Sequence, residues 1–480
     1  MSIFAHFPRA GLLGAALAAT ATCSAPRAVA PMAGAEAPRV EVGSEIAAFY
    51  QARGFRPLWT EGRRLKPAAR RLAALVDSVE LNRAIAAAEE GDPRALVRAD
   101  LLLSKAYVAH AAARDRPPAR VEMRYFDPSL APAAKSPREL LDAAASAPSL
   151  ASVLRRNPAH DGLVRGLALY RATWGRLPQV RIPAAPGPAQ QAALRRRLGV
   201  AGGGNLPAGL REFQRVHGLA VTGLADAATV AALNAGAAHY ERLIERNIER
   251  ARAIPARPGG RMVLVDTAGA RLWMIEDGRI VDSMRAVVGK RDMPTPNLAS
   301  TIRYATLNPY WIVPPDLIRE RARKVLRRGA GVLAAERLQV LSDWSPRARE
   351  LRASAVNWRA VAAGKSYVNL RQRPGPANMM GRVKFMLDNP YGVYLHDTPL
   401  RDLFARADRH ESSGCVRLED AARFARWLFR GAPPRPNGAP EQQVALPEPV
   451  PVYITYLTAL PTRDGVRFQP DVYGRDHARS

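Results

Sequence analysis

Cys415 is the residue of this sequence best suited to covalent chemistry. It is one of two cysteines, and His396 precedes it by 19 positions at the end of an expected strand. A thiol becomes a nucleophile where a base or cation raises its thiolate fraction and where a further group orients that base. The spacing of the pair is therefore suggestive of acyl transfer, with Cys415 as a candidate nucleophile and His396 as a candidate base.

The segment around Cys415 supplies further groups for such a reaction. Gly414 permits close approach of the backbone, and the N–H groups of Gly414 and Cys415, with the Ser413 hydroxyl, could face a developing oxyanion. Arg417 and Arg409 could hold a substrate carboxylate. We expect these residues to share one site.

Residue types and spacing leave alternatives open. His410 is closer to Cys415 in sequence and competes for the role of base, and a single cysteine near histidines is often structural. Trp311 and Tyr394 are candidates for the wall of the cleft, although aromatic residues at strand ends commonly pack in a core. We interpret His217 as a packing or capping residue.

The elements that must position these residues follow from the periodicity of the chain. Helical patterns over residues 36–185 predict a helical domain, and residues 187–236 predict a small three-helix unit. Residues 258–460 predict a mainly β, sandwich-like domain with a helical insertion at 315–380 that could cover a cleft, and residues 461–480 are expected to form a tail. The expected strands are 262–265, 271–275, 281–288, 301–307, 383–387, 393–396 and 451–458. The predicted fold class is multi-domain α+β.

The N-terminus reads as an export signal. Arg9 precedes an apolar run from Gly11 to Ala21, and small residues follow, so residues 1–35 are expected to be a signal peptide or an uncleaved membrane anchor. Cys23 is a weak candidate for lipidation. The expected location is the periplasm or cell envelope.

The net charge of +28 favours anionic surroundings, such as carboxylate-rich polymers. The basic residues are spread along the chain rather than gathered on one arm or face, which argues against a nucleic-acid-binding protein. Compositional bias toward arginine accounts for most of the surplus.

The chemical motif resembles that of a known enzyme family. His396 followed by Ser412-Ser413-Gly414-Cys415-Val416-Arg417 is similar to the signature of L,D-transpeptidases with the YkuD-type catalytic domain, where a histidine precedes Ser-x-Gly-Cys-apolar-Arg. Many members carry histidine two places before the cysteine, whereas this chain has Ser413, as the large multi-domain branch does. The residue that follows the histidine, Asp397, would orient the imidazole through its backbone carbonyl.

Other segments resemble the same branch, in the same order. Residues 49–59 are similar to the start of its helical scaffold domain, and residues 210–234 look like a three-helix peptidoglycan-binding domain. Residues 285–290, Thr295-Pro296, residues 308–311 and residues 313–315 also resemble parts of the catalytic domain.

The resemblance implies a reaction on peptidoglycan tetrapeptide stems. Cys415 would form a thioester with release of D-alanine, and a second stem would resolve it to a 3→3 cross-link. No metal or cofactor is implied, carbapenems are expected to acylate Cys415, and other cell-wall synthesis proteins are further candidate partners. Two alternatives remain: an L,D-hydrolase of the same fold, and a non-catalytic peptidoglycan-binding scaffold.

Overall fold

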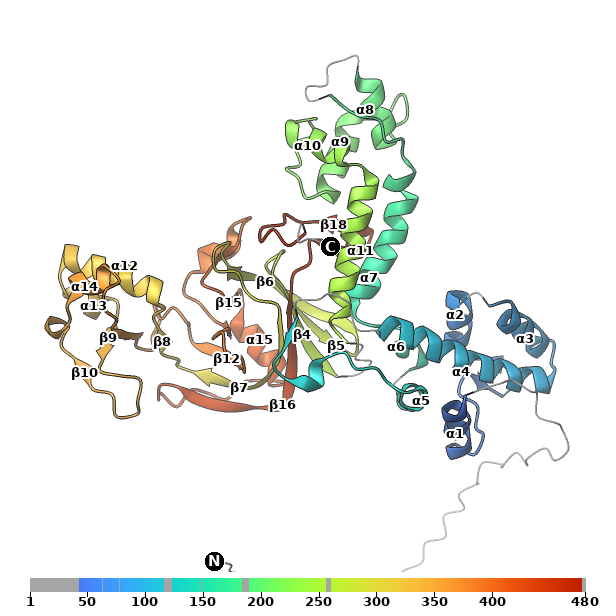
Figure 1. Ribbon diagram of the computed structural model, residues 1–480, viewed down its shortest axis with the longest axis horizontal. Coiled ribbons are helices and arrows are strands. Elements are labelled where there is room, and N and C mark those ends of the chain that lie inside the picture. Colours follow the sequence, from blue (N-terminus) through green and yellow to red (C-terminus); the bar gives the residue numbers. More distant parts are fainter. Residues whose placement is uncertain are drawn as a thin grey trace, which may run out of the picture. The chain divides into compact units, whose positions relative to one another are not determined.

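The structure is a computed structural model that describes residues 43–62, 64–76, 78–115, 123–147, 149–183, 190–255 and 260–476 (Figure 1). The expected signal or anchor at residues 1–35, with Cys23, lies outside the described residues. Across the described ranges, no helix is long and apolar enough to cross a membrane. The chain is a multi-domain α+β protein, as predicted, with mainly helices in its N-terminal half and a large sheet in its C-terminal half.

The N-terminal part is helical and has a hydrophobic core of its own. Its helices are α1 (Ser44–Ala52), α2 (Pro67–Val76), α3 (Val79–Glu89), α4 (Pro93–Asp115), α5 (Pro137–Ser146) and α6 (Leu150–Val153), and β1 (Thr60–Glu61) pairs with β2 (Arg64–Leu65). The next helix, α7 (Pro158–Ala172), packs in a different hydrophobic core. Asp100 of α4 is buried, and its carboxylate accepts hydrogen bonds from the Trp59 N–H at 2.7 Å and the Tyr50 hydroxyl at 2.5 Å. Because a buried carboxylate is costly without such partners, Asp100 ties the loop after α1 to α4.

Three short helices form the small unit, and a long helix follows them. They are α8 (Gln191–Leu198), α9 (Leu206–Val216), α10 (Ala227–Ala235) and the long α11 (Ala237–Arg252). Buried Gln214 holds the loop between α9 and α10, since its side-chain amide donates to the hydroxyls of Thr222 and Thr229. His217 stacks on Phe213 at a centroid distance of 3.8 Å, and burial lowers its pKa to about 3. His217 is thus a neutral packing residue, as interpreted from the sequence.

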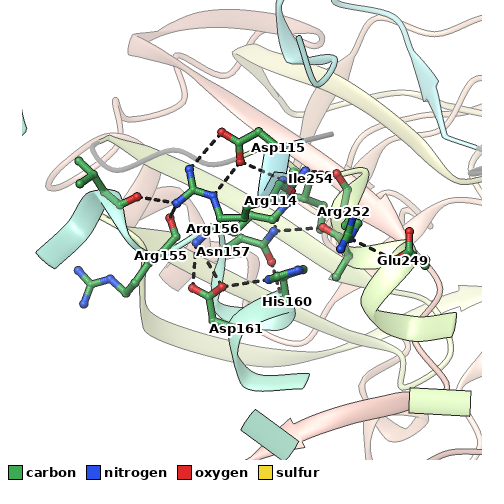
Figure 2. A network of polar contacts seen from close by, with 12 residues as sticks. Arg114, Asp115, Arg155, Arg156, Asn157, His160, Asp161, Glu249, Arg252 and Ile254 are labelled. Carbon is green, nitrogen blue, oxygen red and sulfur yellow. Dashed lines mark hydrogen bonds and ion pairs between the residues drawn. The ribbon is translucent and has the colours of Figure 1, made fainter. Parts of the chain in front are cut away.

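Arg156 joins the ends of three helices (Figure 2). Its buried side chain pairs with Asp115 at the end of α4 at 3.0 Å, and its guanidinium also donates to the carbonyls of Arg114 and Arg252. The neighbouring Asn157 caps α7 and donates to two carbonyls at the end of α11. This network connects α4, α7 and α11.

The large sheet is built mainly from the strands that the period of two predicts. They are β4 (Arg261–Asp266), β5 (Arg271–Glu276), β6 (Arg279–Gly289), β7 (Leu298–Leu307), β12 (Val383–Leu387), β13 (Leu395–His396), β15 (Val416–Leu418) and β16 (Gln442–Thr455). They pair in the order β12-β13-β15-β6-β5-β4-β16-β7, and β7 also pairs with β12, so the path closes on itself. β14 (His410–Ser412) pairs in parallel with the end of β6, and α15 (Ala421–Leu428) follows β15.

The central strands are buried on both faces. In β4, Val263 and Val265 belong to one hydrophobic core, whereas Met262 and Leu264 belong to a second core that includes residues of α7 and α11. Side chains of a strand alternate between its faces, so a strand covered on both sides reads as a continuous apolar run.

Residues 315–380, predicted as a helical insertion, also contain strands. Helices α12 (Pro315–Arg328), α13 (Gly331–Ala335) and α14 (Trp358–Ala362) accompany a four-stranded sheet of β8 (Trp311–Ile312), β9 (Leu338–Leu341), β10 (Glu350–Leu351) and β11 (Asn369–Gln372). The insertion has its own hydrophobic core. Its strands are two to four residues long, and an apolar run this short cannot be told from a helical segment by periodicity.

Two further short segments depart from the sequence prediction. β3 (Arg124–Tyr125), inside the predicted helical domain, pairs in parallel with β7 of the large sheet. Residues 461–476 were predicted as a tail, but most of a hairpin lies within them: β17 (Ala459–Thr462) pairs with β18 (Gly465–Phe468). The residues after β18 then make hydrogen bonds and an ion pair with the rest of the fold. Apolar Val466 and Phe468 of β18 are buried, which explains why this segment is not free.

Candidate active site

Two neighbouring parallel strands bring the predicted catalytic residues together. In the register of β13 and β15, Leu395 lies opposite Val416 and His396 opposite Arg417, and the Val416 N–H donates to the Tyr394 carbonyl at 2.9 Å. Leu395 and Val416 both point into a hydrophobic core. Because side chains alternate along a strand, Tyr394 and His396 lie on the opposite face of the sheet. The same alternation places Cys415 and Arg417 on that face.

His396 is buried and held by the residue that follows it. Its Nδ1 lies 2.5 Å from the backbone carbonyl of Asp397, so Nδ1 carries the proton and Nε2 is left as an acceptor. Burial lowers the pKa of His396 to about 3, and the nearby positive charge of Arg417 acts in the same direction. The imidazole is therefore neutral at physiological pH and can act as a general base.

Asp397 is itself fixed by its side chain. One carboxylate oxygen accepts the Arg382 N–H at 2.9 Å, and the other pairs with the Arg401 guanidinium at 2.5 Å. Gly381 has a φ of +62°, and a β-carbon there would overlap the Asp397 carboxylate. Glycine at this position therefore allows the close approach that holds Asp397 and, through its carbonyl, His396.

Cys415 is a free, half-buried thiol. Its Sγ lies 3.4 Å from the Gly392 carbonyl oxygen. Burial raises the thiol pKa, and this outweighs the opposing effects of the Tyr394 backbone and the Arg417 charge. The sequence interpretation requires a group that raises the thiolate fraction, whereas the resting state here is a protonated thiol, with a neutral imidazole on the same face of the sheet.

A small set of hydrogen bonds shapes the loop before Cys415. The Ser412 hydroxyl donates to the Cys415 carbonyl at 2.6 Å and accepts the Gly414 N–H at 3.1 Å. Buried Thr295 donates to the Gly414 carbonyl at 2.8 Å. Gly414 has a φ of +112°, which other residues rarely adopt. Because the Gly414 N–H already has an acceptor, the Cys415 N–H is the better candidate for an oxyanion donor.

Sequence reasoning assigned no role to Ser412 or Thr295. Ser412 lies within the recognised motif, but its spacing does not reveal that its hydroxyl turns back onto the loop. Thr295 is more than a hundred positions before Gly414, and only the fold brings the two together. The hydroxyl of Ser413, which was assigned to the oxyanion site, makes no hydrogen bond within the described part of the chain.

The two predicted substrate arginines differ in their surroundings. Arg417 lies on the face of Cys415, and its Nε is buried without a hydrogen-bond partner among the described residues. Arg409 donates to five backbone carbonyls, including those of Ala286 at 3.2 Å and Gly269 at 2.9 Å. Its guanidinium is engaged by the fold, so these contacts give no support to a role for Arg409 in holding a substrate carboxylate.

His410, the competing base, is also engaged elsewhere. Its Nδ1 lies 2.6 Å from the Asp408 carboxylate and its Nε2 lies 2.9 Å from the Thr267 carbonyl. Both ring nitrogens therefore have partners other than Cys415. His396, whose Nε2 has no such bond among the described residues, is the better placed of the two bases.

The predicted wall residues lie at the boundary with the insertion. Trp311 is buried in the core of the insertion, and the Arg321 guanidinium lies 5.9 Å from the centre of its ring. Tyr394 is half-buried and packs against the same core. Trp311 thus has the core-packing role that was one of its two interpretations, while Tyr394 connects this core to the face that carries Cys415.

Comparisons with known proteins identify the domains. A model of the L,D-transpeptidase catalytic domain, YkuD, matches residues 260–452. A scaffold domain model matches residues 44–162, and a peptidoglycan binding domain model matches residues 202–233. A curated L,D-transpeptidase of Haemophilus influenzae is 28% identical over 237 residues, which are 48% of this chain and 47% of that protein. The chain thus matches about half the length of this curated relative.

Solved structures titled as L,D-transpeptidases have low sequence identity to this chain. An L,D-transpeptidase from Mycobacterium smegmatis is 14% identical, with 40% of this chain and 58% of that chain covered and a TM-score of 0.20. One from Xylanimonas cellulosilytica is 17% identical, with coverages of 58% and 98% and a TM-score of 0.18. The domain matches and the curated relative show that the chain carries an L,D-transpeptidase catalytic domain of the YkuD type, together with a scaffold domain and a peptidoglycan-binding domain.

Proposed function

We propose that this protein is a peptidoglycan L,D-transpeptidase that forms 3→3 cross-links through a thioester on Cys415. The observation that carries the proposal is the pairing of β13 and β15, which sets Cys415 and an oriented, neutral His396 on one face. The catalytic and peptidoglycan-binding domain matches support wall peptides as the substrate.

The first half-reaction acylates Cys415. Its thiol proton passes to Nε2 of His396 while the sulfur bonds to the carbonyl carbon of the diamino acid at position three of a tetrapeptide stem. The Cys415 N–H donates to the resulting oxyanion. The C–N bond to D-alanine then breaks, and the leaving amine takes the proton from Nε2, which leaves a thioester and a neutral imidazole.

The second half-reaction transfers the acyl group. The side-chain amine of a second stem attacks the thioester carbonyl and gives a proton to His396. The C–S bond breaks, and the sulfur recovers the proton as the thiol. Water in place of the amine would make the enzyme a hydrolase, and a lipoprotein lysine would attach that protein to the wall.

The remaining assignments follow from the substrate. Arg417, with its unpartnered Nε beside Cys415, is the proposed contact for a stem carboxylate. The insertion of residues 315–380 is the proposed cover of the cleft, because Tyr394 packs against its core. We assign the protein to the periplasm or cell envelope, with residues 1–35 as signal peptide or membrane anchor.

The test is intact-protein mass after incubation with a disaccharide-tetrapeptide, comparing the wild type with Cys415→Ala. We expect an acyl adduct on the wild type alone, together with free D-alanine and a cross-linked dimer. A tripeptide without dimer would indicate a hydrolase. If the wild type forms neither adduct nor product and its thiol also resists a carbapenem, the catalytic proposal is wrong and a wall-binding scaffold remains.

A further inference from the structure

The residues after β18 are anchored rather than free. We call residues 469–476 the C-terminal segment. Its Asp471 accepts a hydrogen bond from the Tyr456 hydroxyl at 2.7 Å, and its Asp476 pairs with Arg250 of α11 at 2.7 Å. Tyr473 stacks on Tyr456 with ring centroids 5.1 Å apart. Contacts at both ends of the segment therefore fix the position of Tyr473.

The C-terminal segment contacts the end of β6 and the loop that follows. The Tyr473 hydroxyl donates to the carbonyl of Gly289, the last residue of β6, at 2.6 Å. The Arg475 guanidinium donates to the Asn297 side chain at 2.8 Å, and Arg291 donates to the Val472 carbonyl at 3.0 Å. Arg475 also donates to the Thr295 carbonyl at 3.4 Å, so four polar contacts join this segment to residues 289–297.

Residues 289–297 in turn hold the loop before Cys415. The Gly289 N–H donates to the Thr295 hydroxyl at 2.8 Å, and this hydroxyl donates to the Gly414 carbonyl at 2.8 Å. The Lys290 N–H donates to the Ser412 carbonyl at 2.9 Å. A β-carbon on Gly289 would overlap the backbone of residues 293–295. The turn is thus closed tightly, and a shift of Gly289 must move Thr295.

The position of the Gly414 carbonyl sets the direction of the next N–H. No peptide bond among the described residues is cis, and in a trans peptide the carbonyl and the N–H point in opposite directions. A Gly414 carbonyl held by Thr295 therefore turns the Cys415 N–H away from Thr295. The Gly414 N–H is taken by Ser412, so the Cys415 N–H is the loop donor that depends on this orientation.

We infer that Tyr473 is a positioning residue for the oxyanion donor of the acylation reaction. It acts through Gly289 and Thr295 on the Gly414–Cys415 peptide and does not touch the substrate. This inference rests on the proposed function and adds to it a residue from outside the region that the catalytic-domain model matches, which ends at residue 452. The segment predicted as a tail would then help to position the oxyanion donor of the active site.

The test compares two reactions of the same thiol in the full-length protein. Acylation by a carbapenem or a tetrapeptide passes through an oxyanion, whereas alkylation by iodoacetamide does not. For Tyr473→Phe, we expect the acylation rate to fall on the order of tenfold, because a misdirected oxyanion donor costs part of the 10²–10³ seen when one is removed. The alkylation rate is expected to stay within about twofold of the wild type.

Two further variants complete the design. Tyr125→Phe is the matched control, because the Tyr125 hydroxyl also donates to a backbone carbonyl, that of Ala253, at 2.7 Å. It should leave both rates unchanged and alter the melting temperature by as much as Tyr473→Phe. Arg475→Gln removes the guanidinium contacts to Asn297 and to the Thr295 carbonyl. It should show the same selective loss and replaces Tyr473→Phe in the test if that variant is unstable.

The outcomes separate this inference from the proposed function. A wild type that is alkylated but never acylated would overturn the proposed function, and this inference with it. A wild type that is acylated at the same rate as Tyr473→Phe would overturn this inference alone. An equal fall of acylation and alkylation would also contradict it, because Tyr473 would then act on the thiol rather than on the oxyanion donor.

Discussion

At the scale of single residues, burial sets the protonation states of Cys415 and His396. Burial raises the pKa of the thiol and lowers the pKa of the imidazole, and both shifts disfavour a thiolate–imidazolium pair. The thiol is protonated through the neutral range, and the imidazole is neutral above about pH 3. In the proposed mechanism, deprotonation of Cys415 therefore accompanies attack on the substrate, with His396 as general base.

This arrangement predicts the pH dependence of thiol alkylation. Because only the thiolate reacts, the rate of iodoacetamide alkylation of the wild type should still be rising above about pH 8.5, the ordinary cysteine pKa. The measurement is the alkylation rate by intact mass from acid to alkaline pH. A plateau already reached at neutral pH would show a preformed ion pair and contradict the prediction.

His396→Gln is the companion variant in the same measurement. The acylation rate should fall by about 10²–10⁴, the usual contribution of a general base. The alkylation profile should change little, because the imidazole is not the source of the thiolate. A large shift of that profile would instead assign His396 the role of stabilising the thiolate.

The sequence motif proposes which residues are catalytic, but it does not predict which hydrogen-bond partners each side chain has in the fold. The motif indicated Cys415 and His396, and the parallel register of β13 and β15 places them on one face. The same reasoning treated Arg409 and Arg417 alike, yet Arg409 is occupied by backbone carbonyls. This difference depends on which backbone carbonyls the fold brings near each guanidinium, and sequence spacing does not predict those contacts.

At the scale of elements, Gly381 just before β12 determines how Asp397 supports His396. Gly381→Ala should lower the free energy of unfolding by roughly 3 kcal/mol, since strain of about 1 kcal/mol at positive φ adds to a clash with a fixed carboxylate. Gly54→Ala is the control, because Gly54 has a similar φ of +60° and open space for a β-carbon.

The two glycine variants are compared by chemical denaturation and by acylation rate. Gly54→Ala should cost only about 1 kcal/mol and leave the acylation rate unchanged, whereas Gly381→Ala should also slow acylation through displacement of Asp397. Equal stability losses in the two variants would mean that the Asp397 side chain moves aside without cost.

The same scale shows which elements could be predicted. The Asp277-Gly278 pair between β5 and β6 is a sequence signal for a tight hairpin turn, and both residues adopt the positive φ that such a turn requires. β16 begins at Gln442, earlier than the predicted strand at 451–458. The sequence prediction started late because the segment holds three prolines, which argue against a strand. Pro447 and Pro449 lie where the register of β16 with β7 shifts, between residues 445 and 450, whereas Pro451 lies opposite Thr301 in the resumed pairing.

At the scale of the whole molecule, the arginine surplus has internal uses that composition could not show. The net charge of +28 suggested an anionic partner. Several arginines instead satisfy carbonyls inside the fold: Arg156 at the ends of α4 and α11, and Arg409 beside β6. A cation in such a place raises the net charge without exposing a positive surface, so only part of the surplus is available for wall carboxylates.

Arg156 provides the last prediction, because it connects helices from separate parts of the chain (Figure 2). Its side chain has no exposed surface and its partners come from α4 and α11, so Arg156→Met removes a buried ion pair and leaves two carbonyls without a donor. We expect a loss of about 3 kcal/mol in the free energy of unfolding, because two carbonyls lose their donor at about 1–3 kcal/mol each, while Asp115 keeps Arg114 as its partner at 2.9 Å.

Arg70→Met is the matched control for Arg156→Met. Arg70 pairs with Glu89 at 3.0 Å, but its side chain is 64% exposed, and an exposed pair contributes at most about 1 kcal/mol. Chemical denaturation monitored by tryptophan fluorescence measures both losses, and limited proteolysis after Asp115 reports whether the α4 end has loosened. If Arg156→Met is no less stable than Arg70→Met and is cut no faster, the network is dispensable, and the helices must be held together by their apolar contacts alone.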